Sequence, residues 1–215
     1  MTGDSECCDV GGDLLREDLS AAALELVANG FAALWDAGTP TVGELLPGRA
    51  ELARAVVIDL VQRGRAELDS DGRLMGVHGL TSRATRHRFT HDGRGHHTWC
   101  AFDSVGIPAA MSIDATATSD CPTCGRRLSV VFRAGEAEDE ALVLWLPTRE
   151  RTSHLMKDFC ANADLYCSAD HLRQRVDGAG RLLSLEEALG LGRETWSDVA
   201  HIAIAYQRPG RSHDG

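Results

Sequence analysis

The stretch AELDSDGRLMGV, residues 66–77, decides how the first part of the chain is interpreted. Two short strand-like runs flank Ser70-Asp71-Gly72, and a turn-forming triplet between apolar runs predicts a β-hairpin. The residues before this hairpin show helical periodicity, whereas those after it contain several strand-like runs. The sequence therefore predicts an α+β protein.

Two long helices and a short element precede the hairpin. Apolar residues recur at helical spacing from Asp13 to Trp35, TVGELL forms the short element at 41–46, and a second helix is expected from Pro47 to Gly64. Helix, short helix, helix and hairpin is the order of a winged-helix unit. Residues 13–80 are therefore expected to form a winged-helix-like N-terminal domain, after a disordered tail at 1–12.

After a loop rich in threonine, arginine and histidine at 79–98, the pattern changes. Apolar runs predict strands at 112–118, 127–133 and 141–147, then a short helix at 149–158, a strand at 159–167, and helices at 168–177 and 184–206. A capping box of Ser184 and Glu187 opens the last helix. Residues 81–215 are thus expected to form an α+β domain with a mixed or antiparallel sheet.

Charge and composition narrow the class of protein. The chain has 215 residues and a formal net charge of −10, which argues against a broad nucleic-acid surface. No apolar stretch is long enough to span a bilayer, and the acidic N-terminal residues do not resemble a secretory signal. We therefore expect a cytoplasmic protein with no membrane partner. Its seven cysteines are then candidate ligands, nucleophiles or core residues rather than a disulfide framework.

The first candidate site lies in HHTWCAFDSVGIPAAM, residues 96–111. If residues 98–110 form a helix, Cys100 and Asp103 share one face, with Cβ atoms about 5–6 Å apart. With Thr98 as the N-cap, Cys100 lies in the first turn, where the helix dipole lowers the pKa of a thiol. The carboxylate opposes that effect, so a coupled pair sharing one proton is expected. The alternative is a core cysteine beside a solvated aspartate.

The second candidate site is CPTCG, residues 121–125, in which Cys121 and Cys124 have the spacing of half a zinc site. Candidates for the other half lack knuckle spacing: Cys160, Cys167, His154 and His171. A redox or transfer dithiol, and a turn with core thiols, remain alternatives. In the polar tail, Cys7 and Cys8 could catch a soft metal, although exposed tail thiols are the simpler interpretation.

Cys160 and Cys167 flank the strand expected at 159–167. Because they are seven residues apart, an ideal strand would place them on opposite faces, so they are not expected to act as one pair. Cys160 could point inward and meet Cys100.

The order of several segments resembles the organomercurial lyase (alkylmercury lyase) family. These segments are DGRLMGVHGLTSRATRHRF, HHTWCAFDSVGIPAAM, SDCPTCG, MKDFC and EEALGLGRETW. The resemblance extends from about Leu24 to Ala205. Its specific part is the W-C-A-x-D run together with a second F-C about sixty residues later.

The resemblance implies a winged-helix-like domain joined to an α+β core, and protonolysis of a carbon–mercury bond to a hydrocarbon and Hg(II). At the matching positions, the catalytic residues and ligands of the Hg(II) product would be Cys100, Asp103 and Cys160, with no cofactor required. Cys121 matches a buried family cysteine with a structural role. Cys124 departs from the family pattern, which leaves open a zinc site with Cys121 or an extra thiol near the mercury path.

The implied partners are organomercurial substrates, small cellular thiols and mercuric reductase as the acceptor of Hg(II). The alternative function is a winged-helix metal sensor that binds zinc or another soft metal at its cysteines. A sensor needs a basic recognition helix, but the basic residues of 50–63, Arg54 and Arg63, are balanced by Glu51 and Asp59. The mercury chemistry makes no use of the imidazoles of His96 and His97.

Overall fold

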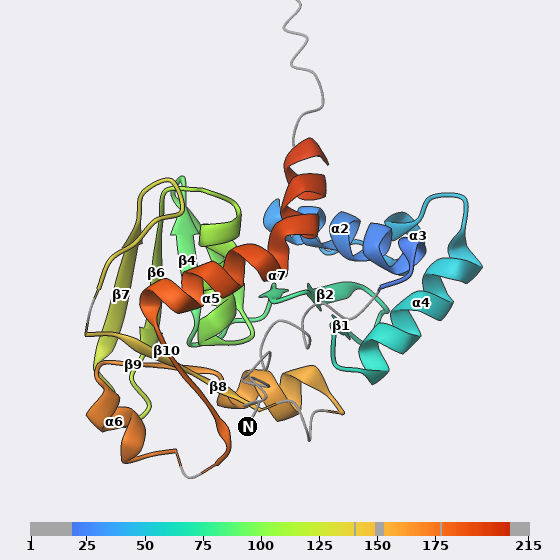
Figure 1. Cartoon of the computed structure of the whole chain (residues 1–215). Helices are drawn as coiled ribbons and strands as arrows, with labels where there is room; N and C mark the ends of the chain where they lie inside the picture. The colour runs from blue at the N-terminus through green and yellow to red at the C-terminus, as the bar shows by residue number, and fades with distance from the viewer. Residues whose placement is uncertain (1–18, 140, 149–152, 177, 207–215) are drawn as a thin grey trace, which may run out of the picture.

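A seven-stranded antiparallel sheet, with strand order β1-β2-β3-β5-β4-β6-β7, runs through the molecule (Figure 1). The computed structural model describes residues 19–139, 141–148, 153–176 and 178–206. A second antiparallel sheet has the order β10-β8-β9. The α+β prediction is confirmed, with antiparallel pairing in both sheets. The tail expected at 1–12 lies outside the described residues.

The helical first part has the predicted order of elements. It comprises α2 (Ala21–Trp35), α3 (Val42–Leu45) and α4 (Ala50–Gln62), followed by the hairpin of β1 (Ala66–Leu68) and β2 (Leu74–Val77). Arg49, rather than Pro47, directly precedes α4. The hairpin strands continue into the large sheet through β3. A winged-helix-like domain at 13–80 therefore stays a prediction, because this sheet runs from β1 to β7 without a break.

The prediction of a loop at 79–98 is wrong. This segment contains β3 (Leu80–Thr81), β4 (Arg88–His91) and β5 (Arg94–Thr98). The sequence pattern did not predict these strands because several side chains on their buried face are polar. In β5, for instance, His96 and Thr98 face inward while the intervening residue is only half-buried. Apolar alternation is the usual signal of a half-buried strand, and here it is absent.

Helix α5 (Ala101–Ala110) is buried nearly all round, between the large sheet and α7 (Leu185–Tyr206) (Figure 1). The two helices approach closely because glycines face each other. A Cβ added at Gly192 would lie 2.4 Å from the Cα of Gly106, so no larger residue fits without moving the helices apart. The ring of Trp196 then packs over Gly106, and its Nε1 donates to the carbonyl of His78 at 2.9 Å. This packing fixes the helix that carries the first candidate site.

The remaining strands of the large sheet are β6 (Ala115–Asp120) and β7 (Arg127–Phe132), close to their predicted positions. The small sheet contains β8 (Val143–Pro147), β9 (Asp164–Tyr166) and β10 (Gly180–Ser184), the last of which was not predicted. The strand expected at 159–167 is shorter, because a π-helical turn (Leu155–Phe159) and a 3-10 turn (Cys160–Asn162) precede β9. Helix α6 covers only Ala169–Arg173. The capping box that opens α7 is confirmed.

Candidate active site of two thiols and a carboxyl group

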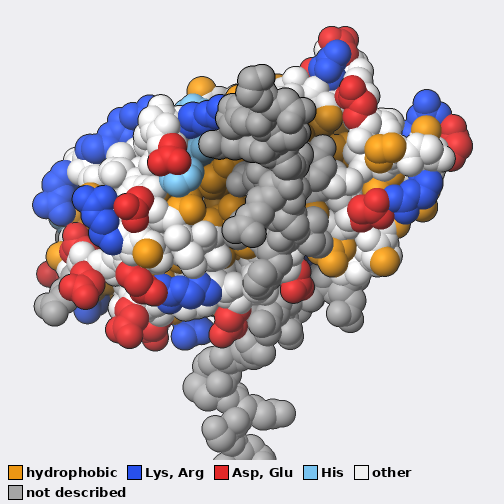
Figure 2. All heavy atoms as spheres, turned by 90° about the horizontal axis from the view of Figure 1, so that it is seen from above, with side chains coloured by type: hydrophobic (Ala, Val, Ile, Leu, Met, Phe, Trp, Pro, Cys, Tyr) orange, Lys and Arg blue, Asp and Glu red, His pale blue; other side chains and the backbone are white. Residues whose placement is uncertain are grey.

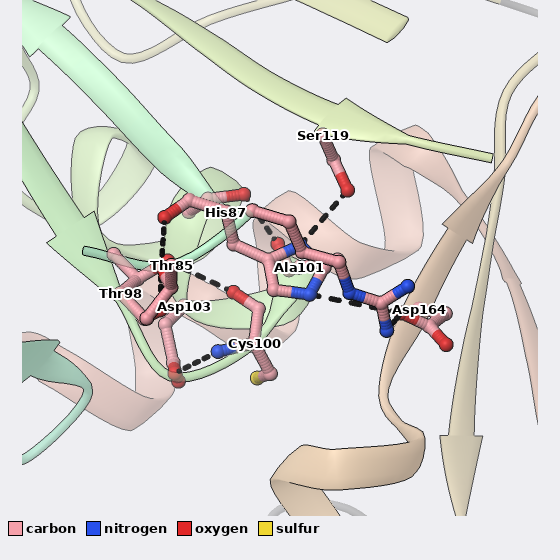
Figure 3. A network of polar contacts seen from close by, with 10 residues as sticks. Thr85, His87, Thr98, Cys100, Ala101, Asp103, Ser119 and Asp164 are labelled. Carbon is pink, nitrogen blue, oxygen red and sulfur yellow. Dashed lines mark hydrogen bonds and ion pairs between the residues drawn. The ribbon is translucent and has the colours of Figure 1, made fainter. Parts of the chain in front are cut away.

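Cys100 caps the helix on which the first candidate site is built. Strand β5 ends at Thr98, so α5 begins later than expected and Cys100, not Thr98, is its N-cap. The backbone N–H of Cys100 donates to Oδ2 of Asp103 at 3.0 Å, and the backbone N–H of Asp103 points at the sulfur of Cys100. This reciprocal arrangement is a capping box with a thiol in place of the usual hydroxyl. Figure 3 shows the Asp103 carboxylate beside the Cys100 backbone nitrogen.

Cys160 reaches the same point from a distant part of the chain. The backbone N–H of Ala101 donates to the carbonyl of Ala163 at 3.1 Å, which ties the start of α5 to the 3-10 turn that carries Cys160. As a result, the ligand atoms of Cys100, Asp103 and Cys160 all lie within 4.8 Å of one another. We refer to these three residues as the thiol–carboxyl cluster.

The cluster is closed to solvent. The exposed fractions are 0% for Cys100, 3% for Asp103 and 5% for Cys160. Burial disfavours the charged form of an acid, and this effect dominates at the carboxyl group. It raises the pKa of Asp103 to about 7, against the hydrogen bonds that the carboxylate accepts. Burial therefore brings the pKa of this carboxyl group into the neutral range, far above that of an exposed aspartate.

Burial also raises the pKa of the Cys100 thiol, with contributions from its hydrogen bond to Cys160 and from the nearby carboxylate. The expected lowering of this pKa by the helix dipole is therefore wrong, because desolvation outweighs the backbone N–H that favours the thiolate. At Cys160, the hydrogen bond from Cys100 lowers the pKa, but burial and the charge of Asp103 together outweigh it and the net shift is upward. Both thiols thus hold their protons unless a ligand or a base takes them.

A glycine makes room for the carboxyl group. Gly79 has φ +95, and a Cβ added there would lie 2.9 Å from Cγ and 3.0 Å from Oδ1 of Asp103. The carbonyl of Gly79 accepts from the backbone N–H of Trp99 at 3.0 Å, and Nε1 of Trp99 donates to Oε2 of Glu67 at 2.7 Å. These bonds hold the residue before Cys100 against the hairpin. No pattern in the sequence indicated this close approach of Asp103 to Gly79.

A buried polar network fixes the backbone on the other side of the cluster (Figure 3). The hydroxyl of Thr98 donates to the Cys100 carbonyl at 3.0 Å, and the hydroxyl of Thr85 donates to the Thr98 carbonyl at 2.8 Å. Nδ1 of His87 lies 2.8 Å from the hydroxyl of Ser119. Burial lowers the pKa of His87 to about 3, so this ring is neutral and serves as a structural element rather than a proton donor.

The second candidate site is more complete than its spacing indicated. Cys121 and Cys124 lie together with Cys167 and His171, and the four ligand atoms are all within 4.8 Å of one another. Of the four candidates for the second half of the zinc site, Cys167 and His171 therefore lie beside CPTCG. Cys167, directly after β9, and His171, in α6, lie beside the turn between β6 and β7, a long-range contact that spacing alone does not reveal.

The histidines ahead of Cys100 have other surroundings. His96 stacks between Trp35 and Phe89, with ring centroids 4.5 and 4.9 Å apart, and burial lowers its pKa to about 4. Nδ1 of His97 accepts from the backbone N–H of Thr85 at 3.2 Å. Neither imidazole belongs to the thiol–carboxyl cluster.

The surface gives little support to nucleic-acid binding. In α4, Arg54 pairs with Glu51 at 2.6 Å, and Arg63 pairs with Asp59. On the face shown in Figure 2, acidic side chains lie among the basic ones. Within the described part of the chain, no helix combines the length and the apolar content needed to cross a membrane.

Comparisons of this chain with a family model and with individual relatives all identify the same class of protein. The family model of alkylmercury lyase matches residues 80–197. An alkylmercury lyase of Staphylococcus epidermidis is 29% identical over 151 residues, which cover 67% of this chain and 65% of that protein. An alkylmercury lyase of Pseudomonas putida is 33% identical over 133 residues, covering 59% of this chain and 61% of that protein. The matches thus span somewhat less than two thirds of these relatives.

A solved structure extends the likeness to the fold. The crystal structure of the mercury-bound form of MerB2 superposes with a TM-score of 0.77 at 21% identity, covering 87% of this chain and 96% of that one. Fold and cluster together define a mixed α+β protein with two buried thiols around a buried carboxyl group. The family model covers more than half of the sequence, and the chain belongs to the alkylmercury lyase family.

Proposed function

We propose that this chain is an organomercurial lyase, which cleaves a carbon–mercury bond by protonolysis and so contributes to mercury detoxification. The observation that carries the proposal is the buried cluster of Cys100, Asp103 and Cys160, whose ligand atoms lie within 4.8 Å of one another. Thiolates are soft ligands and suit a soft cation such as mercury. Simple metal binding has no need of an acid, whereas protonolysis requires one.

The proposed reaction begins at the thiols. Asp103 as carboxylate takes the proton of one cysteine, and the resulting thiolate displaces the incoming ligand X⁻ from R–Hg–X, which leaves as HX with that proton. Asp103 then takes the proton of the second cysteine, whose thiolate adds to mercury and increases electron density on the attached carbon. The electron pair of the C–Hg bond takes this proton from Asp103, giving R–H. The products are R–H, HX and Hg(II) bound to both thiolates, and mercury keeps its oxidation state throughout.

The electrostatics of the cluster suit this sequence. A group that must both accept and deliver a proton works best with a pKa near the operating pH, and burial raises the pKa of Asp103 to about 7. The raised pKa values of both thiols keep them protonated until mercury arrives. Because the three side chains are at most 5% exposed, substrate binding requires a local opening around the cluster.

We further propose that small cellular thiols remove the Hg(II) product by thiol exchange, with mercuric reductase as the acceptor. Exchange through a mixed intermediate is faster than unaided dissociation from two thiolates. Cys7 and Cys8 are candidates for assisting this step. If they do, a Cys7→Ser/Cys8→Ser variant turns over more slowly when free thiol is limiting, and unchanged rates under that condition would remove the hypothesis.

The central experiment is headspace chromatography of the hydrocarbon released from phenylmercury or methylmercury with excess thiol. We expect Cys100→Ser, Cys160→Ser and Asp103→Asn each to lower the rate at least about a hundredfold, the scale of a lost general acid. Asp103→Asn should still bind the organomercurial, which mass spectrometry of the native protein detects. With excess thiol, the Cys7→Ser/Cys8→Ser variant is the cysteine-matched control and should retain the wild-type rate.

Normal hydrocarbon release by Cys100→Ser would contradict the assignment of the thiol–carboxyl cluster. Absence of any release from the wild-type protein, together with tight metal binding, would instead favour the metal-sensor alternative. That alternative also predicts specific DNA binding, for which an acidic chain with paired arginines on α4 offers little support.

A further inference from the structure

A second cluster of ligands lies at the far end of the large sheet and takes no part in the proposed lyase reaction. Cys121 and Cys124 belong to the turn between β6 and β7, Cys167 follows β9, and His171 lies in α6. The sulfur of Cys167 is 3.7 Å from the sulfur of Cys121 and 3.7 Å from that of Cys124. Nδ1 of His171 is 3.8 Å from the Cys121 sulfur.

These distances are those of a tetrahedral zinc site. With Zn–S of about 2.3 Å and Zn–N of about 2.0–2.1 Å, tetrahedral geometry separates two sulfurs by about 3.8 Å and a sulfur from a nitrogen by about 3.5 Å. Three of the observed separations lie within about 0.3 Å of those values. The fourth, 2.8 Å between the Cys167 sulfur and Nδ1 of His171, is a thiol–imidazole hydrogen bond. With a metal in place of the thiol proton, tetrahedral geometry would set this separation at about 3.5 Å.

Backbone hydrogen bonds fix the shape of the turn that carries Cys121 and Cys124. The N–H of Gly125 donates to the Cys121 carbonyl at 2.8 Å, and the N–H of Cys121 donates to the Arg126 carbonyl at 2.9 Å. Gly125 has φ +70, a conformation that favours glycine. The hydroxyl of Thr123 donates to the His171 carbonyl at 2.7 Å, which joins the turn directly to α6. The two halves of the cluster are therefore held together by contacts other than the thiols.

We propose that Cys121, Cys124, Cys167 and His171 bind one Zn(II) ion as a structural Cys₃His site. Four protein ligands leave no open position, which distinguishes structural from catalytic zinc. The site fastens the β6–β7 turn to the segment β9–α6, and β9 starts four residues after Cys160. Zinc thus stabilises the part of the chain that presents one thiol of the proposed active site. The inference does not depend on the lyase reaction.

The test measures metal content in the full-length protein, purified without chelator from cells grown with zinc. We expect about one equivalent of zinc by mass spectrometry of the metals. Cys124→Ser and His171→Ala should each lose most of it, whereas Cys160→Ser, the matched change in the other cluster, should keep it. Replacement by Co(II) should give the absorption of a tetrahedral cobalt thiolate, and His171→Cys should shift those bands while retaining the metal.

A second measurement covers the case in which a ligand variant fails to fold. In the wild-type protein, a strong chelator should remove zinc and lower the melting temperature by several degrees. It should also free the solvent-exposed Cys124 thiol for alkylation by iodoacetamide, and zinc but not magnesium should reverse these changes. Zinc well below one equivalent, zinc retained by Cys124→Ser and His171→Ala alike, copper in place of zinc, or a disulfide among the three cysteines would each overturn the proposal.

Discussion

Replacing Asp103 with asparagine separates the charge of the buried carboxyl group from its shape. Asp103 is 3% exposed, and burial raises its pKa from 3.8 to about 7. An acid with a higher pKa in the folded protein binds its proton more tightly there than in the unfolded chain. Its stabilising effect is therefore complete below pH 3.8 and is lost as the pH rises through about 7. Asp103→Asn cannot ionise and escapes this loss.

Linkage gives the size of the effect. With pKa values of 3.8 unfolded and about 7 folded, wild type should lose about 2 to 3 kcal/mol of unfolding free energy relative to the variant between pH 5 and pH 8. The full difference between low and high pH approaches about 4 kcal/mol. The cap survives the change, because the amide oxygen of asparagine can accept the N–H of Cys100 as Oδ2 does now.

The assay is urea unfolding of both proteins under reducing conditions at pH 5, 6, 7 and 8. Asp71→Asn, at an exposed position in the β1–β2 turn, is the matched control for the same chemical change. A stability difference between wild type and Asp103→Asn that stays constant across this range would refute the reasoning, as would a variant less stable than wild type at pH 8. Either result would mean that the carboxyl group ionises in the folded protein without cost.

Three further predictions concern packing and pH. Gly79→Ala places a Cβ against the carboxyl group of the cluster, whereas Gly72→Ala, at another glycine with a positive φ, meets open space. In urea unfolding we expect the first change to cost about 2 kcal/mol and the second about 1 kcal/mol. Only Gly79→Ala should also abolish the proposed lyase activity. Gly192→Ala should destabilise the folded protein by at least about 2 kcal/mol in thermal melts, because the new Cβ separates α7 from α5. Gly190→Ala, in open space on the same helix, is the control and should be neutral or stabilising by up to about 1 kcal/mol. The pKa of His96 is lowered from 6.5 to about 4, so the stabilising effect of the neutral ring is complete above pH 6.5 and is lost as the pH falls toward 4. The unfolding free energy of His96→Phe, measured against that of wild type, should therefore be about 2 kcal/mol higher at pH 5 than at pH 8.

Local patterns in the sequence predicted local structure well. The spacing of Cys100 and Asp103 predicted their pairing on one helix, and the turn residues predicted the β1–β2 hairpin. The start of α5 was misplaced because β5 continues to Thr98 and the thiol itself caps the helix. Thiols are rarely considered as caps, since serine, threonine, aspartate and asparagine lead at that position.

Long-range proximity was harder to predict. The residue pattern allowed Cys160 to point inward and meet Cys100, but did not require it. Only the resemblance to the family predicted that the two thiols share a site. Nothing in the spacing of His171 connected it with CPTCG, because the contact depends on how β9 pairs with β8 and where α6 follows. Strands with histidine and threonine on their buried face are equally invisible to a search for apolar alternation.

In the reaction that we propose, the two oxygens of Asp103 would have different surroundings to work from. Oδ2 accepts the backbone N–H of Cys100, whereas Oδ1 faces Gly79, where the missing side chain leaves room. A protonated carboxyl group keeps one oxygen as an acceptor, so the helix cap persists while the other oxygen gains and loses its proton. The proposed proton transfer would therefore not require α5 to fray. Asparagine keeps an acceptor for the cap and removes the ionisable group, so a folded but inactive Asp103→Asn protein would show that Asp103 contributes more than the helix cap.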